Sequence, residues 1–192
     1  GRFKAPDALI AYITSFTKLL PGDVIATGTP GGVGFTREPP LFMKPGDVIE
    51  AMAPHGGFTW AFESNAARHY CAFAGGSGIT PILSLLKAAL ETEPGSRFTL
   101  CYGNRTSAGI MFLEELAGLK DRFIDRLRLF HFLEDEEEEI ALFNGRLDSA
   151  KIDDILANLI AASDIDAFFI CGPGPMMDAV EAALRARGVA KG

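Results

Sequence analysis

The sequence predicts an α/β fold with a doubly wound parallel sheet over its C-terminal two thirds. Short apolar runs alternate with helical patterns from Tyr70 onward, and the connections between them are short. Such alternation is typical of parallel strands joined by helical crossovers. Hydrophobic residues make up 48% of the 192-residue chain and charged residues 22%, which is enough apolar material for a packed core and excludes a disordered or fibrous protein. A short β-rich N-terminal fragment is expected to precede the sheet.

Four apolar segments are the expected strands: residues 70–74, 98–102, 127–133 and 167–171. After each of them, apolar residues recur at three- and four-residue steps, the spacing of one helix face. The expected inner faces carry Ile79, Ile82, Leu83, Leu86 and Leu90 in the first helix, Ile110, Leu113 and Leu116 in the second, and Ile152, Ile155, Leu156, Leu159 and Ile160 in the third. Pro175 opens the last helix, because proline suits the first helical position.

The net charge of −7 comes almost entirely from one run of six acidic residues, 134–139. We expect a solvated loop there rather than a metal site. The chain is not basic enough to indicate nucleic acid as a partner. It has no stretch of roughly 18 to 20 apolar residues, which a membrane helix needs, and its N-terminus does not resemble a signal peptide. Three cysteines without zinc spacing further favour the cytoplasm.

Three loops at the carboxyl ends of the expected strands form the candidate site, because open α/β sheets bind ligands there. The first loop contains Gly75, Gly76, Ser77, Gly78, Ile79, Thr80 and Pro81. Glycines let the backbone approach a ligand, and the free amides of the helix N-terminus attract phosphate. Ser77 and Thr80 add hydroxyl donors. A plain tight turn is the alternative, since the spacing is not the G-x-G-x-x-G fingerprint.

The second loop contains Tyr102, Gly103, Asn104, Arg105 and Thr106. Enzymes that prefer NAD usually carry an acid here for the ribose hydroxyls, whereas an arginine suits a 2′-phosphate. Because no acid lies between Tyr102 and Ala108, Arg105 favours NADPH, with NADH as the weaker candidate. The alternative is an ordinary surface arginine.

The third loop begins at Cys171 and continues through Gly172, Pro173, Gly174, Met176 and Met177. A cysteine followed by two glycines has little side-chain volume, which leaves space for a flat ring to lie against the backbone. The alternatives are that Cys171 is a small buried hydrophobe and that the two methionines pack the helix. Cys71 and Cys101 are interpreted as buried hydrophobes. The three histidines have neither metal spacing nor a visible acid partner.

Four motifs occur in order along the chain: residues 71–81, 102–106, 144–148 and 171–177. Together they resemble the NAD(P)H-binding domain of the ferredoxin–NADP reductase superfamily over residues 53–189, in particular the reductase subunits of multicomponent oxygenases such as the phenylacetyl-CoA epoxidases. The resemblance implies that the first loop holds the pyrophosphate and the nicotinamide side, and that the second loop holds the adenosine end. It also implies that Cys171, the candidate catalytic residue, lies near the nicotinamide carbon that gives up hydride.

The same resemblance implies an oxidoreductase that passes hydride from NADPH to FAD, and electrons onward through a 2Fe-2S centre to an oxygenase component. Residues 52–58 resemble the last strand of a flavin domain. The near match to a flavin motif at residues 68–71 lies in the first strand and has cysteine in place of a hydroxyl, so we reject it. Three cysteines do not match a plant-type iron–sulfur domain. We therefore expect no FAD or 2Fe-2S site and little or no reductase activity from this chain alone; a non-catalytic nucleotide-binding module is an alternative.

Residues 8–50 resemble a different family, the C-terminal part of the fumarylacetoacetate hydrolases. Residues 9–13, 21–34 and 39–47 carry this resemblance. It implies an alternative function, a metal-dependent hydrolase or decarboxylase of diketo acids, with Thr29 at a substrate-contacting position. The metal ligands of that family would lie before Gly1, so we expect no metal site. The expected domains are residues 1–50, a junction at 51–64 and a nucleotide-binding domain at 65–192, with the two family fragments joined near 44–51.

Overall fold

The structure, a computed structural model, describes residues 56–137 and 139–190. The expected N-terminal fragment, with Thr29 and the join near residues 44–51, lies outside the described residues. The chain divides into two compact units, Gly1–Thr59 and Trp60–Gly192, and all the helices and strands named below belong to the second. The domain boundaries expected from the sequence stay a prediction.

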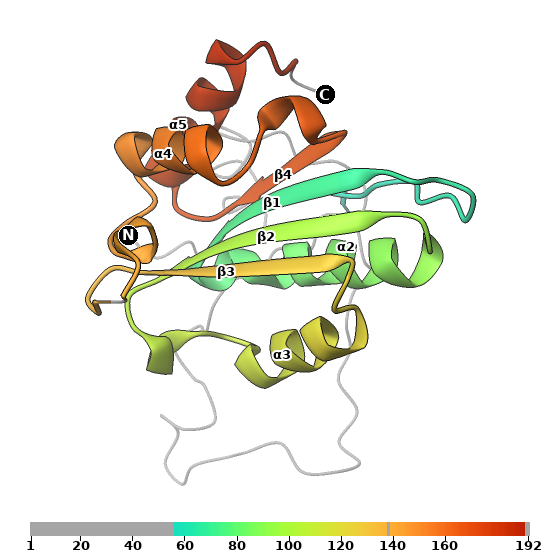
Figure 1. Ribbon diagram of the computed structural model, residues 1–192, viewed down its shortest axis with the longest axis horizontal. Helices are drawn as coiled ribbons and strands as arrows, with labels where there is room; N and C mark the ends of the chain where they lie inside the picture. The colour runs from blue at the N-terminus through green and yellow to red at the C-terminus, as the bar shows by residue number, and fades with distance from the viewer. Residues whose placement is uncertain (1–55, 138, 191–192) are drawn as a thin grey trace, which may run out of the picture. The chain divides into compact units, whose positions relative to one another are not determined.

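A four-stranded sheet forms the centre of the second unit (Figure 1). Its strands are β1 (His69–Gly75), β2 (Arg97–Asn104), β3 (Leu127–Leu133) and β4 (Ala167–Cys171), and their spatial order is β3-β2-β1-β4. Each pair of neighbouring strands is parallel. β1 is buried along almost its whole length, as expected for a strand that is covered on both faces. The predicted strands and their parallel arrangement are therefore confirmed.

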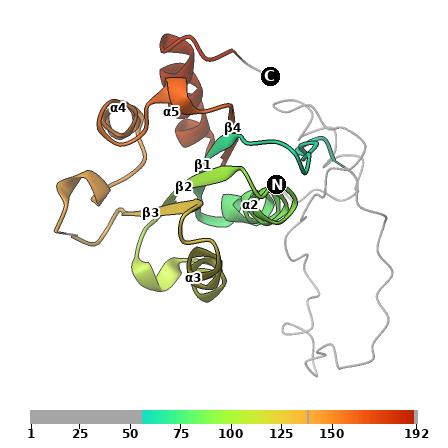
Figure 2. The same ribbon diagram turned by 45° about the vertical axis from the view of Figure 1, so that its right-hand side comes forward.

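Two helices cover each face of the sheet (Figure 2), which confirms the predicted doubly wound fold. The helices α2 (Ile79–Thr92) and α3 (Leu113–Arg122) lie on one face, and α4 (Ser149–Asn158) and α5 (Gly174–Ala186) lie on the other. Because side chains alternate along a strand, each strand contributes to two cores. In β1, Tyr70 packs toward α2 and α3, whereas Cys71 and Phe73 pack toward α4 and α5.

The start of α3 differs from the prediction. The sequence pattern places Ile110, Leu113 and Leu116 on the inner face of one helix, but the helix begins only at Leu113. Phe112, just before it, has a positive φ of 59°, a left-handed conformation that is rare for residues other than glycine. Leu113 follows this turn and is 43% exposed, and the buried face is formed by Leu116 and Leu119 instead.

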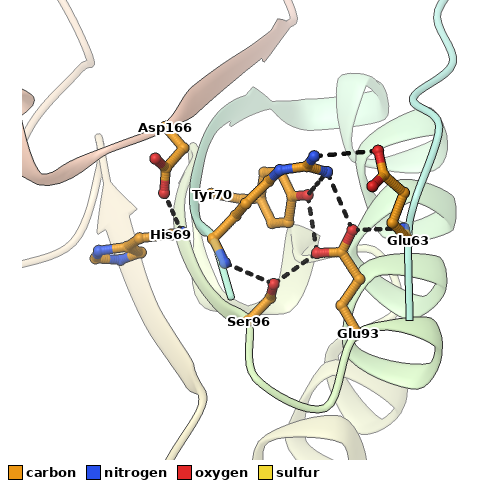
Figure 3. A network of polar contacts seen from close by, with 7 residues as sticks. Glu63, His69, Tyr70, Glu93, Ser96 and Asp166 are labelled. Atoms are coloured by element: carbon orange, nitrogen blue, oxygen red, sulfur yellow. Dashed lines mark hydrogen bonds and ion pairs between the residues drawn. The ribbon is translucent and has the colours of Figure 1, made fainter. Parts of the chain in front are cut away.

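A buried carboxylate lies where the chain enters β1 (Figure 3). The Glu93 side chain is 0% exposed and accepts hydrogen bonds from Tyr70 Oη at 2.9 Å, from Ser96 Oγ at 2.5 Å and from the backbone N–H of Glu63 at 2.9 Å. Arg68 Nη1 lies 3.4 Å from the same carboxylate. Arg68 and Tyr70 thus belong to a structural network, in agreement with their rejection as a flavin motif. The network ties the segment before β1 to the end of α2.

Candidate functional site

The three candidate loops converge at the carboxyl edge of the sheet, around a cavity of about 790 Å³. Cavities of roughly 300–1,000 Å³ are typical of small-molecule sites. A fourth segment, which follows β3, completes the wall. The lining comes from Gly75 and Gly76 in the first loop, from residues 103–106 in the second, from Pro173, Pro175 and Met176 in the third, and from residues 145–149 in the fourth segment.

Glycines bring the first and third loops into backbone contact. A Cβ atom on Gly78 would lie 2.1 Å from the carbonyl oxygen of Cys171, so a larger residue has no room there. A Cβ atom on Gly75 would lie 2.7 Å from Pro173 Cδ. Gly76 is different. No atom lies within 4 Å of the position of a Cβ atom there, so glycine is favoured only by the left-handed φ of +51°. The first loop is therefore closed against the third at Gly78 and open toward the cavity at Gly76.

The other predicted residues of the first loop are not part of the cavity wall. Ile79 is 0% exposed and belongs to the core under α2. Thr80 Oγ1 donates to the carbonyl oxygen of Ser77 at 3.1 Å, and Pro81 is half-buried in the first turn of the helix. These side chains shape the N-terminus of α2. The N–H of Ile79 is already bonded to the carbonyl oxygens of Gly76 and Ser77, and Pro81 has no N–H. The first N–H groups of this helical run therefore lie in the 3₁₀ turn Gly76–Gly78, which is the part of the loop that suits a phosphate.

Tyr102 supports the site from within the protein and does not line it, which corrects the prediction of a direct cofactor contact. Its side chain is 0% exposed, because it faces the core under α2. Its hydroxyl donates to the carbonyl oxygen of Gly76 at 2.9 Å. Burial raises the pKa of Tyr102, so the hydroxyl remains a donor at neutral pH. Tyr102 is thus a positioning residue for the first loop.

Asn104 belongs to the wall of the cavity, but its side-chain amide is turned into the protein. Its Nδ2 atom is buried, and the hydrogen bond between the Asn104 side chain and the Tyr102 hydroxyl partly offsets the rise that burial causes in the Tyr102 pKa. Asn104 therefore shapes the wall together with Tyr102 and does not offer a free donor to a ligand.

Acidic side chains reach the second loop from the end of β3. Asp135 Oδ2 lies 3.1 Å from Nη2 and 3.2 Å from Nε of Arg105. Glu136 Oε1 accepts hydrogen bonds from the backbone N–H of Ser107 at 2.9 Å and from its hydroxyl at 3.1 Å. The parallel strands β2 and β3 end side by side, so acids distant in sequence stand beside this loop. Residues 134–137 form a surface loop, as expected, and the first of its acids are also paired with groups of the second loop.

The segment 145–149 is missing from the predicted site, although it lines the cavity. Gly145 has a φ of +91°, and Asp148 caps α4 by accepting a hydrogen bond from the backbone N–H of Lys151 at 2.9 Å. Arg146 lies 2.6 Å from Glu134, so a second guanidinium–carboxylate pair borders the cavity. The sequence carries two signals for this segment. Residues 144–148 are one of the four motifs of the family resemblance, and the segment lies between the end of β3 and the N-terminus of α4, as the first loop lies between β1 and α2.

Cys171 lies at the end of β4 and is half-buried. Burial raises the pKa of its thiol, so the sulfur is protonated at neutral pH and is not an activated nucleophile. Its carbonyl group faces Gly78, and its side chain is not part of the cavity wall. The structure therefore places Cys171 beside the site and leaves its predicted catalytic role untested.

The remaining third-loop residues divide between the cavity and the core. Pro173 and Met176 line the cavity, and their predicted contact with a cofactor stays a prediction. A Cβ atom on Gly172 would lie 2.7 Å from Met176 Cε, so glycine is needed for that contact, whereas Gly174 is surrounded by open space. Met177 packs into the core beneath α4 and α5, in agreement with the alternative interpretation that the methionines pack the helix.

The residues at this edge suit a dinucleotide better than a metal or an iron–sulfur cluster. Within residues 56–137 and 139–190, no group of three or more His, Cys, Asp or Glu side chains is placed to hold a metal ion. Cys71 and Cys101 are buried in neighbouring strands, apart from the end of β4 where Cys171 lies. The open backbone at Gly76 and the turn that leads into α2 instead suit an extended ligand with phosphates. None of the helices in the described part is long and apolar enough to cross a membrane.

Comparisons with known proteins agree with this geometry. The profile of the oxidoreductase NAD-binding domain family matches residues 73–182, a range that includes all three candidate loops. The profile of the fumarylacetoacetate hydrolase C-terminal family matches residues 3–60. Both resemblances predicted from the sequence motifs are therefore confirmed.

Two curated relatives are similar over most of this chain. It is 41% identical over 171 residues to one subunit of the 1,2-phenylacetyl-CoA epoxidase of Escherichia coli (strain K12), which is 88% of this chain and 48% of that protein. It is 36% identical over 144 residues to the ferredoxin reductase component of 3-ketosteroid-9-alpha-monooxygenase from Rhodococcus rhodochrous, which is 75% of this chain and 37% of that protein. The chain thus spans about half of the first relative's length and less of the second.

Solved structures share the fold. The FAD/NAD-binding domain of a nitric oxide dioxygenase from Vibrio cholerae is 27% identical, with a TM-score of 0.57 over 72% of this chain and 53% of that one. The cytochrome b5 reductase domain of Ulva prolifera nitrate reductase is 25% identical, with a TM-score of 0.56 over 66% of this chain and 48% of that one. Because the family profile spans more than half of its residues, the chain belongs to the oxidoreductase NAD-binding domain family.

Proposed function

We propose that the chain binds a nicotinamide dinucleotide in the cavity at the carboxyl edge and presents it for hydride transfer to a flavin. The convergence of the three loops on one cavity carries this proposal. One similar protein is named as the ferredoxin reductase component of a monooxygenase. By analogy, we infer that the flavin belongs to another part of the full-length protein and that an oxygenase component accepts the electrons.

Each loop has a separate part in this proposal. The N–H groups of the turn Gly76–Gly78, which leads into α2, hold the pyrophosphate, because the positive end of the helix attracts anions. Gly76 lets its backbone approach the nicotinamide half, and Asn104 forms part of the cavity wall. The third loop lines the cavity through Pro173 and Met176. Cys171, at the end of β4, lies beside the cavity, and its place near the nicotinamide carbon stays a prediction. The nucleotide supplies the hydride when bound, and the protein orients it and excludes water.

Calorimetric titration of the purified chain with NADH tests the proposal. We expect one nucleotide bound per chain. Lys87→Gln serves as a control, because Lys87 is paired with Glu115 on the surface away from the loops and should not affect binding. A titration without saturable binding would refute the proposal.

Replacing Tyr102 with phenylalanine should weaken dinucleotide binding without unfolding the protein. The change removes the donor that holds the Gly76 carbonyl, and one hydrogen bond contributes about 0.5–1.5 kcal/mol, which corresponds to roughly two- to tenfold in affinity. Tyr70→Phe is the matched control, since Tyr70 is also buried but bonds to Glu93 at the other end of the sheet. It should lower stability and leave the affinity unchanged. Equal affinity of Tyr102→Phe and the wild type would show that the hydroxyl does not position the loop.

The charge at the second loop determines which nucleotide we propose. The prediction of NADPH depends on Arg105 and on the lack of an acid within residues 102–108. Asp135 and Glu136 bring two carboxylates to this loop, and Arg105 is paired with the first of them. They would repel a 2′-phosphate, whereas a ribose hydroxyl can donate a hydrogen bond to a carboxylate. We therefore propose NADH, in place of NADPH, as the preferred nucleotide.

Replacing Asp135 with asparagine should raise the affinity for NADPH relative to NADH by about tenfold. The change frees Arg105 for the 2′-phosphate, and a hydrogen bond to a charged group contributes about 1.5–3 kcal/mol. Titrations of both nucleotides at one ionic strength measure the ratio. Adding Arg105→Ala should abolish the gain, and Asp153→Asn, which breaks the surface pair with Arg187, should leave the ratio unchanged. A wild-type protein that prefers NADPH would overturn the NADH proposal and support the prediction made from the sequence.

A diketo-acid hydrolase remains the second candidate function, because the fumarylacetoacetate hydrolase profile matches residues 3–60. The match covers less than a third of the chain, and the part that the structure describes offers no metal-binding group. Carbon–carbon bond hydrolysis that depends on added magnesium or manganese would support this second function.

A further inference from the structure

A second cavity, of about 380 Å³, lies at the opposite, amino-terminal edge of the sheet. Its floor consists of His69, Thr99 and Arg128, which stand near the starts of β1, β2 and β3. Its other wall is the last turn of α4 and the segment that leads to β4, within residues 156–165. It shares no lining residue with the first cavity, so a ligand there would occupy a separate site.

The floor residues project from one face of the sheet. In the parallel register, His69 lies opposite Arg97, and Thr99 lies opposite Arg128. Because side chains alternate along a strand, these four all project toward α4. Figure 3 shows the His69 ring on the other side of β1 from Glu93. The register thus gathers two guanidinium groups, an imidazole and a hydroxyl beside one cavity.

The floor carries a positive charge. His69 Nε2 lies 2.9 Å from Thr99 Oγ1, and Thr99 is 0% exposed. Burial lowers the pKa of His69, and the charges of Arg97 and Arg128 lower it further, so the ring is neutral at pH 7. Neither arginine forms an ion pair with any residue that the structure describes. Arg128 stacks on Phe130, with its Cζ atom 5.5 Å from the ring centroid, and its five donors remain available.

Two nearby acids do not cancel this charge. Asp166 Oδ2 accepts a hydrogen bond from the backbone N–H of His69 at 2.7 Å, and it affects the His69 pKa less than either arginine does. Asp164 is exposed at the rim and accepts a hydrogen bond from Ser163 Oγ at 3.2 Å. The His69 ring therefore experiences a net positive environment on the strand side of the cavity.

The helix side of the cavity has the opposite character. Leu159, Ala161 and Ile165 give it an apolar surface, and the C-terminal turn of α4 carries the negative end of the helix dipole. An anionic group is thus favoured beside Arg128 and disfavoured beside α4. An apolar group is favoured against the helix side. A ligand that satisfies both sides has a charged head and an apolar body.

We propose that this second cavity binds a small organic carboxylate. The carboxylate accepts hydrogen bonds from the Arg128 guanidinium, whose planar fork matches it, and the apolar body lies against the end of α4. The cavity volume is within the range of small-molecule sites, at its lower end. The site is independent of the dinucleotide proposal, because no residue is common to both.

Titration with benzoate, followed by the amide resonances of the ¹⁵N-labelled chain, tests this proposal. Benzamide is the neutral ligand of the same shape, and inorganic phosphate is an anion without an apolar body. We expect benzoate to shift resonances within residues 156–165 and to bind at least tenfold more tightly than benzamide or phosphate. Arg128→Gln should weaken benzoate binding at least tenfold, and Arg122→Gln, at a surface arginine paired with Glu91, should not.

Three results would overturn the proposal. Equal binding of benzoate and benzamide to the wild type would exclude recognition of the charge, and this comparison needs no variant. Tighter binding of phosphate would point to a simple anion site. Shifts confined to residues 103–106 and 145–149 would place benzoate in the first cavity, and saturating NADH would then displace it.

Discussion

Replacing Glu93 with alanine should lower the free energy of unfolding by about 3–5 kcal/mol, the usual cost of removing one partner from a buried ionic network. The change leaves Tyr70 Oη, Ser96 Oγ and the N–H of Glu63 without their acceptor, and leaves Arg68 without its buried counter-charge. Urea denaturation of the chain measures the effect. Glu91→Ala is the control, because Glu91 is exposed and paired only at the surface, and it should cost less than about 1 kcal/mol.

The contribution of Glu93 to the free energy of unfolding should decrease as the pH falls. Burial alone raises the pKa of Glu93, but the hydrogen bonds from Ser96, Glu63 and Tyr70 and the charge of Arg68 more than offset it, so the pKa lies below its usual value of 4.5. A carboxyl group with a lowered pKa stabilises the folded state above its usual pKa, and this stabilisation is lost as the pH falls through the lowered value. The wild type and Glu93→Ala should therefore differ most at neutral pH and approach one another below pH 4.5. A difference that grows in acid would contradict this account.

Replacing Gly78 with alanine should cause the largest loss of dinucleotide binding and also destabilise the domain. The new Cβ atom would lie 2.1 Å from the carbonyl oxygen of Cys171 and 2.8 Å from the backbone nitrogen of Gly172, so the first and third loops must separate. Overpacking costs about 1–3 kcal/mol in general and occasionally more, and we expect at least about 3 kcal/mol here because both clashing atoms belong to the backbone. Thermal unfolding and NADH titration measure the two losses.

Gly118→Ala is the matched control for this variant. Gly118 lies inside α3 with open space around the position of a Cβ atom. Alanine is a better helix former than glycine by about 0.5–1 kcal/mol, so this variant should be slightly more stable and bind NADH normally. If Gly78→Ala bound NADH as well as Gly118→Ala does, the close contact between the two loops would not matter for binding.

The sheet could be predicted from the sequence because its strands are short apolar runs separated by clear helical periodicity. The parallel order then brings the ends of the strands together, and it follows that the three loops meet at one edge. The place of Cys71 and Cys101 in the core could be predicted for the same reason, since both lie inside apolar strands. Local patterns were sufficient wherever a residue's environment is set by its own strand or helix.

The charges around the second loop could not be predicted in this way. Asp135 lies beside Arg105 only because β2 and β3 end at the same level of the sheet, which is a property of the register and not of either segment. Tyr102 is both the last residue of the expected strand and the first of the second loop, and only the packing of β2 shows that its side chain belongs to the core. The exposure of Leu113 depends on the single left-handed residue before it. In each case a tertiary constraint decides the role of a residue that local sequence leaves open.

The hydrogen bond from the Glu63 N–H to the Glu93 carboxylate includes the segment before β1 in the part of the protein that unfolds cooperatively. Trp60 and Phe62 lie edge-on against Tyr70, with ring centroids 6.0 Å and 5.7 Å away, and the N–H of Glu63 is bonded to the buried carboxylate. Opening this segment therefore requires breaking the core beneath α2. The amide of Glu63 should exchange with deuterium nearly as slowly as those of β1, although it lies in no regular element.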